Sequence, residues 1–251
     1  MDCRIYHEHL DEIDSTNRFV RDEAARLWSM ENGCGMVAVT AAYQTAGRGQ
    51  RGNTWDSAIG NNLLLTILVR PGKALEVTQQ FLLSQTVAVA IHKALERYGI
   101  DARLKWPNDI YVGNRKLAGV LVELDYMGKY VEQVVIGIGL NVNQCDFPEM
   151  DRVPVSMKML LDRVISVDDV LAEILDCFNL YYSELMCGGG LCIPDKYMSL
   201  LLGWGEVSEY KDLHGRFRAV VECVGPDGYL FLRRLDGSIS RYAFKEVEML
   251  L

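Results

Sequence analysis

The sequence predicts a mixed α+β fold, in which a mixed sheet with helices is followed by a small C-terminal β-barrel. In residues 1–200, apolar runs of strand length alternate with longer segments whose apolar side chains recur at helical spacing. From Gly205 on, short strand-like runs alternate with turns such as Pro226-Asp227-Gly228, which is typical of a small barrel or sandwich. We therefore expect two domains, residues 1–200 and residues 201–251.

The first half of the chain predicts strands and helices in alternation. Asp14-Ser15-Thr16-Asn17 supplies several cap-forming residues, so a helix is expected to start there and to continue to about Met30. Gly99 ends a second, longer helix. The other elements expected here are strands at Ile5–Leu10, Met36–Ala42 and Asn62–Arg70, a polar loop at Tyr43–Gly60 and the long helix at Val77–Tyr98.

The second half predicts short strands and one more long helix. Gly113-Asn114 is a turn signal between two strand-like runs, and Gly188-Gly189-Gly190 interrupts the pattern before the C-terminal part. The elements expected here are strands at Arg103–Trp106, Ile110–Val112, Lys116–Leu124 and Tyr130–Gly139, a helix at Val167–Met186, and C-terminal strands at Arg216–Val224, Tyr229–Leu235 and Ser238–Phe244.

Composition limits the class of protein. The 251 residues are 49% hydrophobic and 24% charged, as in globular proteins. No apolar run reaches the roughly 20 residues that span a bilayer, and Met1–Glu8 lacks the features of a signal peptide. The seven cysteines include no C-x-x-C pair, and the four histidines show no zinc spacing. We expect a cytoplasmic protein without membrane contact, disulfide framework or metal site of its own.

Charge is distributed unevenly along the chain. The formal net charge of −8 argues against a general nucleic-acid binder. Residues 121–200 hold 13 acidic and 5 basic side chains, whereas residues 101–120 hold four basic and two acidic ones. The local basic cluster is either a solvated surface stripe or a pocket for small anions.

A glycine- and arginine-rich loop, Gly47–Gly52, matches G-x-G-x-x-G literally. A dinucleotide-binding fingerprint would open a helix and be followed by an acidic residue about 20 positions on, but a strand follows here and Gly72-Lys73 occupies that position. Glycines let backbone N–H groups approach an anion, and arginines suit carboxylate and phosphate. The loop is therefore predicted to bind an anion; a flexible basic loop is the alternative.

Three further segments carry candidate chemistry. In Lys105-Trp106-Pro107-Asn108-Asp109, the proline fixes the backbone, and a carboxylate beside amides and a lysine suits a magnesium-bound triphosphate; a simple bend with an Asx turn is the alternative. On a strand, Lys116, Ala118 and Val120 would share one face, although Lys116 is equally compatible with an isolated surface lysine. The glycines of Gly137–Asn143 indicate close approach by a ligand or another backbone, or else a bulge.

Taken in order, these segments resemble the biotin–protein ligase family. Each motif is weak alone, but five in the family's order are specific, and the resemblance covers nearly the whole chain, including the C-terminal small barrel. The motifs are Asp14-Ser15-Thr16-Asn17, Gln44–Gly52, Lys105–Asp109, Lys116-Leu117-Ala118-Gly119 and Gly137-Ile138-Gly139-Leu140-Asn141.

The resemblance implies a biotin–[acetyl-CoA-carboxylase] ligase. Such an enzyme uses ATP, with Mg²⁺, to convert biotin to biotinyl-5'-AMP, and then transfers biotin to a lysine of a biotin carboxyl carrier protein. Residues 1–200 would form the catalytic domain that binds biotin and ATP, and a homodimer is compatible with the resemblance. Some members carry an N-terminal helix-turn-helix and act as repressors. None fits before Asp14, so no DNA partner is expected.

The resemblance also implies roles for individual residues. The catalytic residues would be Lys116, Arg48 and Asp109, with Mg²⁺ near Asp109. The biotin site would comprise Ser15, Thr16, Asn17, Gln44, Gly47, Arg48, Gly49, Gln50, Lys116 and Gly119. The ATP site would comprise Arg51, Trp55, Lys105, Asn108 and Asn141.

Gln50 departs from the family pattern, because the loop often reads G-R-G-R-R-G with arginine at this position. The departure predicts a looser hold on the reaction intermediate. A lipoate ligase or acyl transferase of similar fold is the nearest alternative, and a DNA-binding biotin sensor or a dehydrogenase is disfavoured by the charge balance and the loop context.

Overall fold

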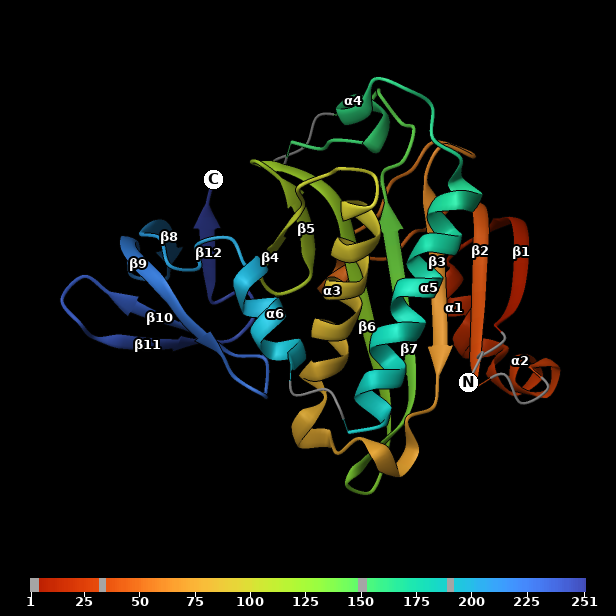
Figure 1. Ribbon diagram of the computed structural model, residues 1–251, viewed down its shortest axis with the longest axis horizontal. Helices are drawn as coiled ribbons and strands as arrows, with labels where there is room; N and C mark the ends of the chain where they lie inside the picture. The colour runs from red at the N-terminus through yellow and green to blue at the C-terminus, as the bar shows by residue number, and fades with distance from the viewer. Residues whose placement is uncertain (1–4, 32–34, 149–152, 189–191) are drawn as a thin grey trace.

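The computed structural model describes residues 5–31, 35–148, 153–188 and 192–251. Its larger part contains a seven-stranded sheet of order β1-β2-β3-β7-β6-β5-β4 (Figure 1). β1 and β2 are parallel and the other neighbouring strands are antiparallel, so the predicted mixed sheet is confirmed. The strands are β1 Tyr6–Ile13, β2 Met36–Gln44, β3 Leu63–Val69, β4 Arg103–Lys105, β5 Asp109–Val112, β6 Arg115–Met127 and β7 Tyr130–Leu140.

Helices pack on both faces of this sheet. The long helices α3 and α5 lie side by side over one face (Figure 1), and α1 and α2 pack against the other. In β2, Met36 and Ala38 join the core under α3 and α5, whereas Val37 and Val39 join the core under α1 and α2. The helices are α1 Thr16–Asp22, α2 Ala24–Met30, α3 Phe81–Glu96, α4 Met157–Leu161, α5 Val167–Met186 and α6 Ile193–Leu200.

On the sheet face under α1, the side chains closest to β6 are small or polar. Thr66 of β3 lies there, two residues before Leu68 of the α1 core. Gly137 and Gly139 of β7 continue the alternation that places Val135 on the same face. These positions carry little side-chain volume, so they leave a hollow beside α1 in which the candidate site lies.

The C-terminal part forms a second, antiparallel sheet of order β11-β10-β9-β8-β12. The small all-β part expected at the C-terminus is thus present; its ladder ends at β11 and β12, so the described residues form a five-stranded sheet without barrel closure. Phe217 stacks between Tyr210 and Tyr242, and burial raises the pKa of Tyr210 to about 12. The strands are β8 Ser208–Asp212, β9 Gly215–Val224, β10 Leu230–Arg234, β11 Ile239–Tyr242 and β12 Val247–Leu250.

Several predicted boundaries differ from those observed. The helix expected up to Met30 is two short helices that break at Glu23, whose backbone leaves the helical region. The helix expected from Val77 starts at Phe81, because the Val77 N–H donates to the Lys129 carbonyl and residues 77–79 form a 3₁₀ turn, η3. Further 3₁₀ turns are η1 Gln50–Gly52 and η2 Gly72–Ala74. In the described part of the chain, every helix is too short or too polar to cross a membrane.

Candidate active site

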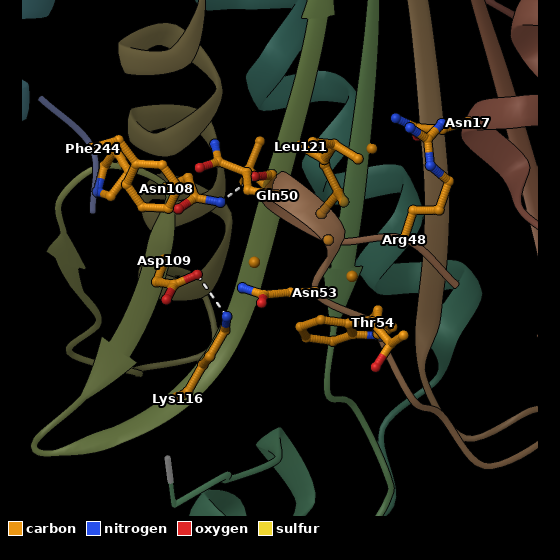
Figure 2. A pocket seen from close by; sticks show the side chains of 18 of the residues that line it. Asn17, Arg48, Gln50, Asn53, Thr54, Asn108, Asp109, Lys116, Leu121 and Phe244 are labelled. Carbon is orange, nitrogen blue, oxygen red and sulfur yellow. Dashed lines mark hydrogen bonds and ion pairs between the residues drawn. The ribbon is translucent and has the colours of Figure 1, made fainter. Parts of the chain in front are cut away.

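A pocket of 380 Å³ lies between the α1 face of the large sheet, the Gly47–Gly52 loop and the C-terminal sheet. Its volume is within the range of small-molecule sites. All five sequence motifs, far apart along the chain, contribute to its wall, and Figure 2 labels residues from four of them. The predicted residues that line it are Ser15, Thr16, Asn17, Gln44, Arg48, Gly49, Gln50, Trp55, Lys105, Asn108, Asp109, Lys116 and Gly119.

One end of the pocket is built from neutral polar groups that hold one another in place. The Thr16 N–H and hydroxyl both donate to Gln44 Oε1, at 2.8 and 3.0 Å. The fully buried Thr66 hydroxyl lies 2.7 Å from Asn17 Oδ1 and 2.8 Å from Thr16 Oγ1. Because both Thr16 donors bond to the Gln44 oxygen, the Gln44 amide N–H₂ must point away from Thr16. We call this group the neutral end.

Ser15 has the backbone position that the sequence predicts, but its side chain has another use. It is the N-cap of α1, yet its hydroxyl makes no capping hydrogen bond, although capping is the usual use of serine at this position. The side chain is only 2% exposed and lines the pocket. The backbone N–H of Ser15 is satisfied by the Asp14 carboxylate at 2.6 Å. Ser15 is therefore part of the neutral end, and its hydroxyl is not used to cap the helix.

Two glycines of β7 make room for side chains above the sheet. A Cβ on Gly137 would lie 2.3 Å from Asn17 Oδ1, and one on Gly139 would lie 2.4 Å from the Trp55 ring. The predicted close approach is thus present, but the approaching groups are side chains of the pocket. The indole N–H of Trp55 is buried without a hydrogen-bond partner among the described residues. Such a group is costly to leave unsatisfied, so it favours a ligand with an acceptor here.

The other end of the pocket is charged. Lys116 Nζ lies 2.6 Å from Asp109 Oδ1, and the two side chains are 21% and 8% exposed (Figure 2). Nζ also lies 5.7 Å from the centre of the Trp55 ring. A shielded ion pair of this kind fixes the ammonium in place while leaving it in contact with the pocket. We call this group, together with Lys105 and Asn108, the charged end.

Lys116 reaches the pocket through a β-bulge. Tyr111 pairs with Lys116, but the preceding Ile110 pairs with Ala118, so one extra residue is inserted in β6. The prediction that Lys116 and Ala118 share a face is therefore wrong. Lys116 lies instead on the side of Gly119, where an added Cβ would be 3.3 Å from its Nζ. Alternation counted from the sequence cannot detect a bulge.

The Lys105–Asp109 segment is fastened to both sheets. Asn108 Nδ2 donates to the Val120 carbonyl at 2.5 Å, and Trp106 Nε1 donates to the Gly228 carbonyl of the C-terminal sheet at 3.0 Å. The Trp106 ring also packs edge-on against Phe244. The turn is therefore part of the contact between the two sheets, and the peptide bond before Pro107 is cis.

The Gly47–Gly52 loop folds back as a hairpin and leads to a strand, which disfavours the dinucleotide fingerprint. The Gly49 N–H donates to the Asn53 carbonyl at 2.7 Å, and the Trp55 N–H donates to the Gly47 carbonyl at 3.0 Å. A Cβ on Gly47 would lie 2.3 Å from the Trp55 oxygen, so this glycine closes the hairpin and does not line the pocket. The side chain of Arg51, expected at ATP, lies outside the described residues.

Asn141 is the other predicted residue that does not line the pocket. It is 4% exposed and donates from Nδ2 to the Val155 carbonyl at 3.1 Å, beneath the Lys116 backbone, which bonds to Val153 and Val155. Sequence reasoning also missed residues that do line it. Those outside the sequence motifs are Asn53, Thr54, Leu65, Val120, Leu121, Phe244, Lys245, Val247 and Glu248, whereas Trp106, Pro107, Gly137, Ile138 and Gly139 belong to the motifs but were not named as site residues.

The missed C-terminal residues come from the turn before β12 and from the first two residues of β12. Lys245 has a φ of 72°, a left-handed backbone that is uncommon outside glycine. Its sequence context contains no motif, so no sequence signal tied it to the site.

In the described part of the chain, no group of three His, Cys, Asp or Glu side chains is placed to hold a metal ion. His7 and His9 each form a hydrogen bond with the Thr40 hydroxyl at 2.9 Å instead.

Fold and pocket together are those of a protein ligase. Residues 10–141 match the Biotin/lipoate A/B protein ligase family, and the chain belongs to this family. It is 33% identical to the bifunctional ligase/repressor BirA of Bacillus subtilis (strain 168), over 93% of this chain and 70% of that protein. It is 31% identical to a biotin–[acetyl-CoA-carboxylase] ligase of Paracoccus denitrificans, over 89% and 92% of the two.

A solved structure extends the likeness to the whole chain. The biotin protein ligase of Aquifex aeolicus in complex with biotin and ATP superimposes with a TM-score of 0.79 at 25% identity, covering 98% of each chain. The likeness thus includes the C-terminal sheet as well as the residues that match the family.

Proposed function

We infer that this chain is an ATP-dependent biotin–protein ligase, which activates biotin to biotinyl-5'-AMP and transfers it to a lysine of a biotin carboxyl carrier protein. The observation that carries this inference is the joining of a buried neutral end and a charged end in one pocket. Biotin has the matching chemistry, since its ureido ring is neutral and its side chain ends in a carboxylate. The relatives from Bacillus subtilis, Paracoccus denitrificans and Aquifex aeolicus support the assignment.

The ureido ring of biotin is proposed to bind at the neutral end. The ring offers one carbonyl acceptor and two N–H donors. Ser15, Thr16, Asn17 and Gln44 supply hydroxyl and amide groups whose positions are already set by hydrogen bonds. Preset donors and acceptors bind without losing further side-chain freedom, so this end is suited to recognition.

Lys116 and Arg48 are proposed to hold the biotin carboxylate and the α-phosphate of ATP together. A carboxylate oxygen attacks the α-phosphorus and pyrophosphate leaves, but both reactants are anions. A fixed ammonium and a guanidinium offset their repulsion and stabilise the charge that spreads in the transition state. Asp109 is best placed to position Lys116, because its Oδ1 already contacts the ammonium. Removal of the acceptor lysine's proton is its alternative role.

The ATP phosphates are proposed to lie toward Lys105, Asn108 and Lys245. Mg²⁺ would enter with them, because this ion usually binds through one or two carboxylates and the substrate phosphates. Asp109 and Glu248 are the acidic side chains of the described pocket wall, which fits such an ion better than a resident metal. When bound, Mg²⁺ would shield phosphate charge; Asp109 and Glu248 would hold it.

The Gly47–Gly52 loop is proposed to close over the intermediate. Biotinyl-adenylate is a mixed anhydride that water hydrolyses, and a closed loop excludes water. The amine of a carrier lysine then attacks the acyl carbon, forming an amide, and AMP leaves. Residues 1–200 would carry most of this chemistry, while residues 201–251 supply one wall. We propose no DNA partner, since the net charge is −8.

Isotope exchange between ATP and pyrophosphate tests this function. We expect exchange that depends on biotin and is not supported by lipoate, followed by labelling of a carrier-protein lysine. Exchange supported by lipoate and not by biotin would favour the lipoate-ligase branch of the family instead. Exchange with neither acid would contradict both assignments.

A further inference from the structure

A partly buried glutamate just outside the pocket contacts both the neutral end and the glycine–arginine loop. Glu123 lies on β6, on the α1 side of the sheet, with a side chain that is 16% exposed. Its Oε2 accepts a hydrogen bond from Asn17 Nδ2 at 2.9 Å. Its Oε1 lies 3.3 Å from Arg48 Nη2 and 3.5 Å from Arg21 Nη1. Each carboxylate oxygen therefore contacts a different part of the site.

The contact with Asn17 sets the orientation of an amide at the biotin end. With Nδ2 bonded to Glu123, Oδ1 must face the Thr66 hydroxyl, 2.7 Å away. The glycine at position 137 leaves room for this arrangement and no more, since a Cβ there would lie 2.3 Å from Oδ1. Hydrogen bonds to a charged acceptor are stronger than neutral ones, so Glu123 is the dominant constraint on the amide.

The contact with Arg48 is of a different kind. The Arg48 side chain is 47% exposed, and an exposed ion pair contributes little to stability. It does, however, hold the guanidinium next to Asn17, and both side chains lie on the same side of the pocket in Figure 2. The hydrogen bonds within the loop fix its backbone, but they do not fix the direction of the long Arg48 side chain.

We propose that Glu123 is a positioning residue, which couples biotin recognition by Asn17 to the placement of Arg48 in the loop that retains the adenylate. This inference rests on the proposed function and deepens it. The carboxylate acts through its two partners and makes no contact with substrate itself.

Two substitutions separate the two contacts. In Glu123→Gln, the amide oxygen can still accept from Asn17, but the N–H₂ then faces guanidinium groups that have no acceptor, so the contacts with Arg48 and Arg21 are lost and the Asn17 contact is kept. In Glu123→Ala all three contacts are lost. Asp125→Asn is the matched control, because Asp125 also pairs with Arg21, at 3.1 Å, on the same strand. It has no recorded contact with Asn17 or Arg48.

The measurements are the biotin dissociation constant by calorimetry and the release rate of preformed biotinyl-adenylate. We expect Glu123→Ala to weaken biotin binding roughly 10-fold or more and Glu123→Gln to leave it within about 3-fold. Both should release the adenylate at least about 3-fold faster, while Asp125→Asn matches the wild type. A merely structural role would lower the thermal midpoint and change both measurements together in every variant.

The proposal is overturned if Glu123→Gln weakens biotin binding as much as Glu123→Ala, or if both variants match Asp125→Asn. Should Glu123→Ala fail to fold, the near-isosteric Glu123→Gln still decides the loop contact by its release rate, and equality with wild type rejects the coupling. A wild-type protein without biotin-dependent exchange would refute the proposed function. An active wild type with unchanged variants refutes only the role of Glu123.

Discussion

The two ends of the pocket are built by different means. At the neutral end, Ser15, Thr16 and Asn17 are 2–4% exposed. Thr16 is hydrogen-bonded to Gln44, and Asn17 is hydrogen-bonded to Thr66. At the charged end, Lys116 is 21% exposed and comes from a bulged strand, and its neighbours come from the Lys105–Asp109 segment, which packs against the C-terminal part. Folding of the large sheet therefore completes the neutral end, whereas the charged end also depends on contacts between the two sheets. Under the proposed function, recognition relies on fixed geometry and activation on placed charge.

The largest expected effect comes from removing the charge at the charged end. Lys116→Met keeps the aliphatic stem, so the fold should survive, but it removes an interaction made mainly in the transition state. We expect kcat for biotin-dependent pyrophosphate exchange to fall at least roughly 100-fold. Lys129→Met is the control, since Lys129 is 66% exposed and pairs with Glu76 away from the pocket. Near-normal exchange by Lys116→Met would remove the basis for the two-ended pocket.

Substitution of the two β7 glycines tests whether the ends act separately. Gly137→Ala drives a methyl into Asn17, and Gly139→Ala drives one into Trp55; overpacking of this kind costs about 1–3 kcal/mol. We expect Gly137→Ala to raise KM for biotin roughly 10-fold and Gly139→Ala to raise KM for ATP by a similar factor. Steady-state kinetics with each substrate varied in turn will measure this. If both variants affect the same substrate, the division is wrong.

Substitution of Gln50 tests how the loop between the two ends holds the adenylate. It lines the pocket where arginine is common in the family, and arginine would add a charged contact to phosphate. A hydrogen bond to a charged group contributes about 1–2 kcal/mol more than a neutral one, so Gln50→Arg should slow the release of biotinyl-adenylate roughly 5- to 30-fold. Equal rates, with Arg51→Ala releasing faster, would mean that Arg51 already supplies that charge.

The smallest expected effect is a difference in salt sensitivity. Salt screens exposed charges and leaves buried neutral hydrogen bonds largely unchanged. Raising ionic strength from about 0.05 to 0.5 M should therefore increase KM for ATP severalfold, while the biotin dissociation constant by calorimetry changes less than about twofold. Equal salt dependence of the two would indicate that charge contributes as much to binding biotin as it does to binding ATP.

Sequence reasoning located the neutral end better than the charged end. The family resemblance assigned Ser15, Thr16 and Gln44 to the site, and the cap and strand patterns placed them at the ends of regular elements, where the structure has them. Lys116 was identified as a candidate, but its face was wrong, since a bulge has no signature in the hydrophobic pattern. The wall around Phe244 and Lys245 was missed because it depends on how the two sheets pack. Such long-range contacts leave no local pattern in either segment.

The position of Lys245 in the pocket wall has a consequence for how the protein is made. The residues of the neutral end leave the ribosome well before those of the turn before β12. A nascent chain can therefore assemble the part that recognises biotin long before the wall opposite it exists. A chain that lacks this turn would hold the vitamin without generating a reactive anhydride, so that activation begins only after the turn has been synthesised.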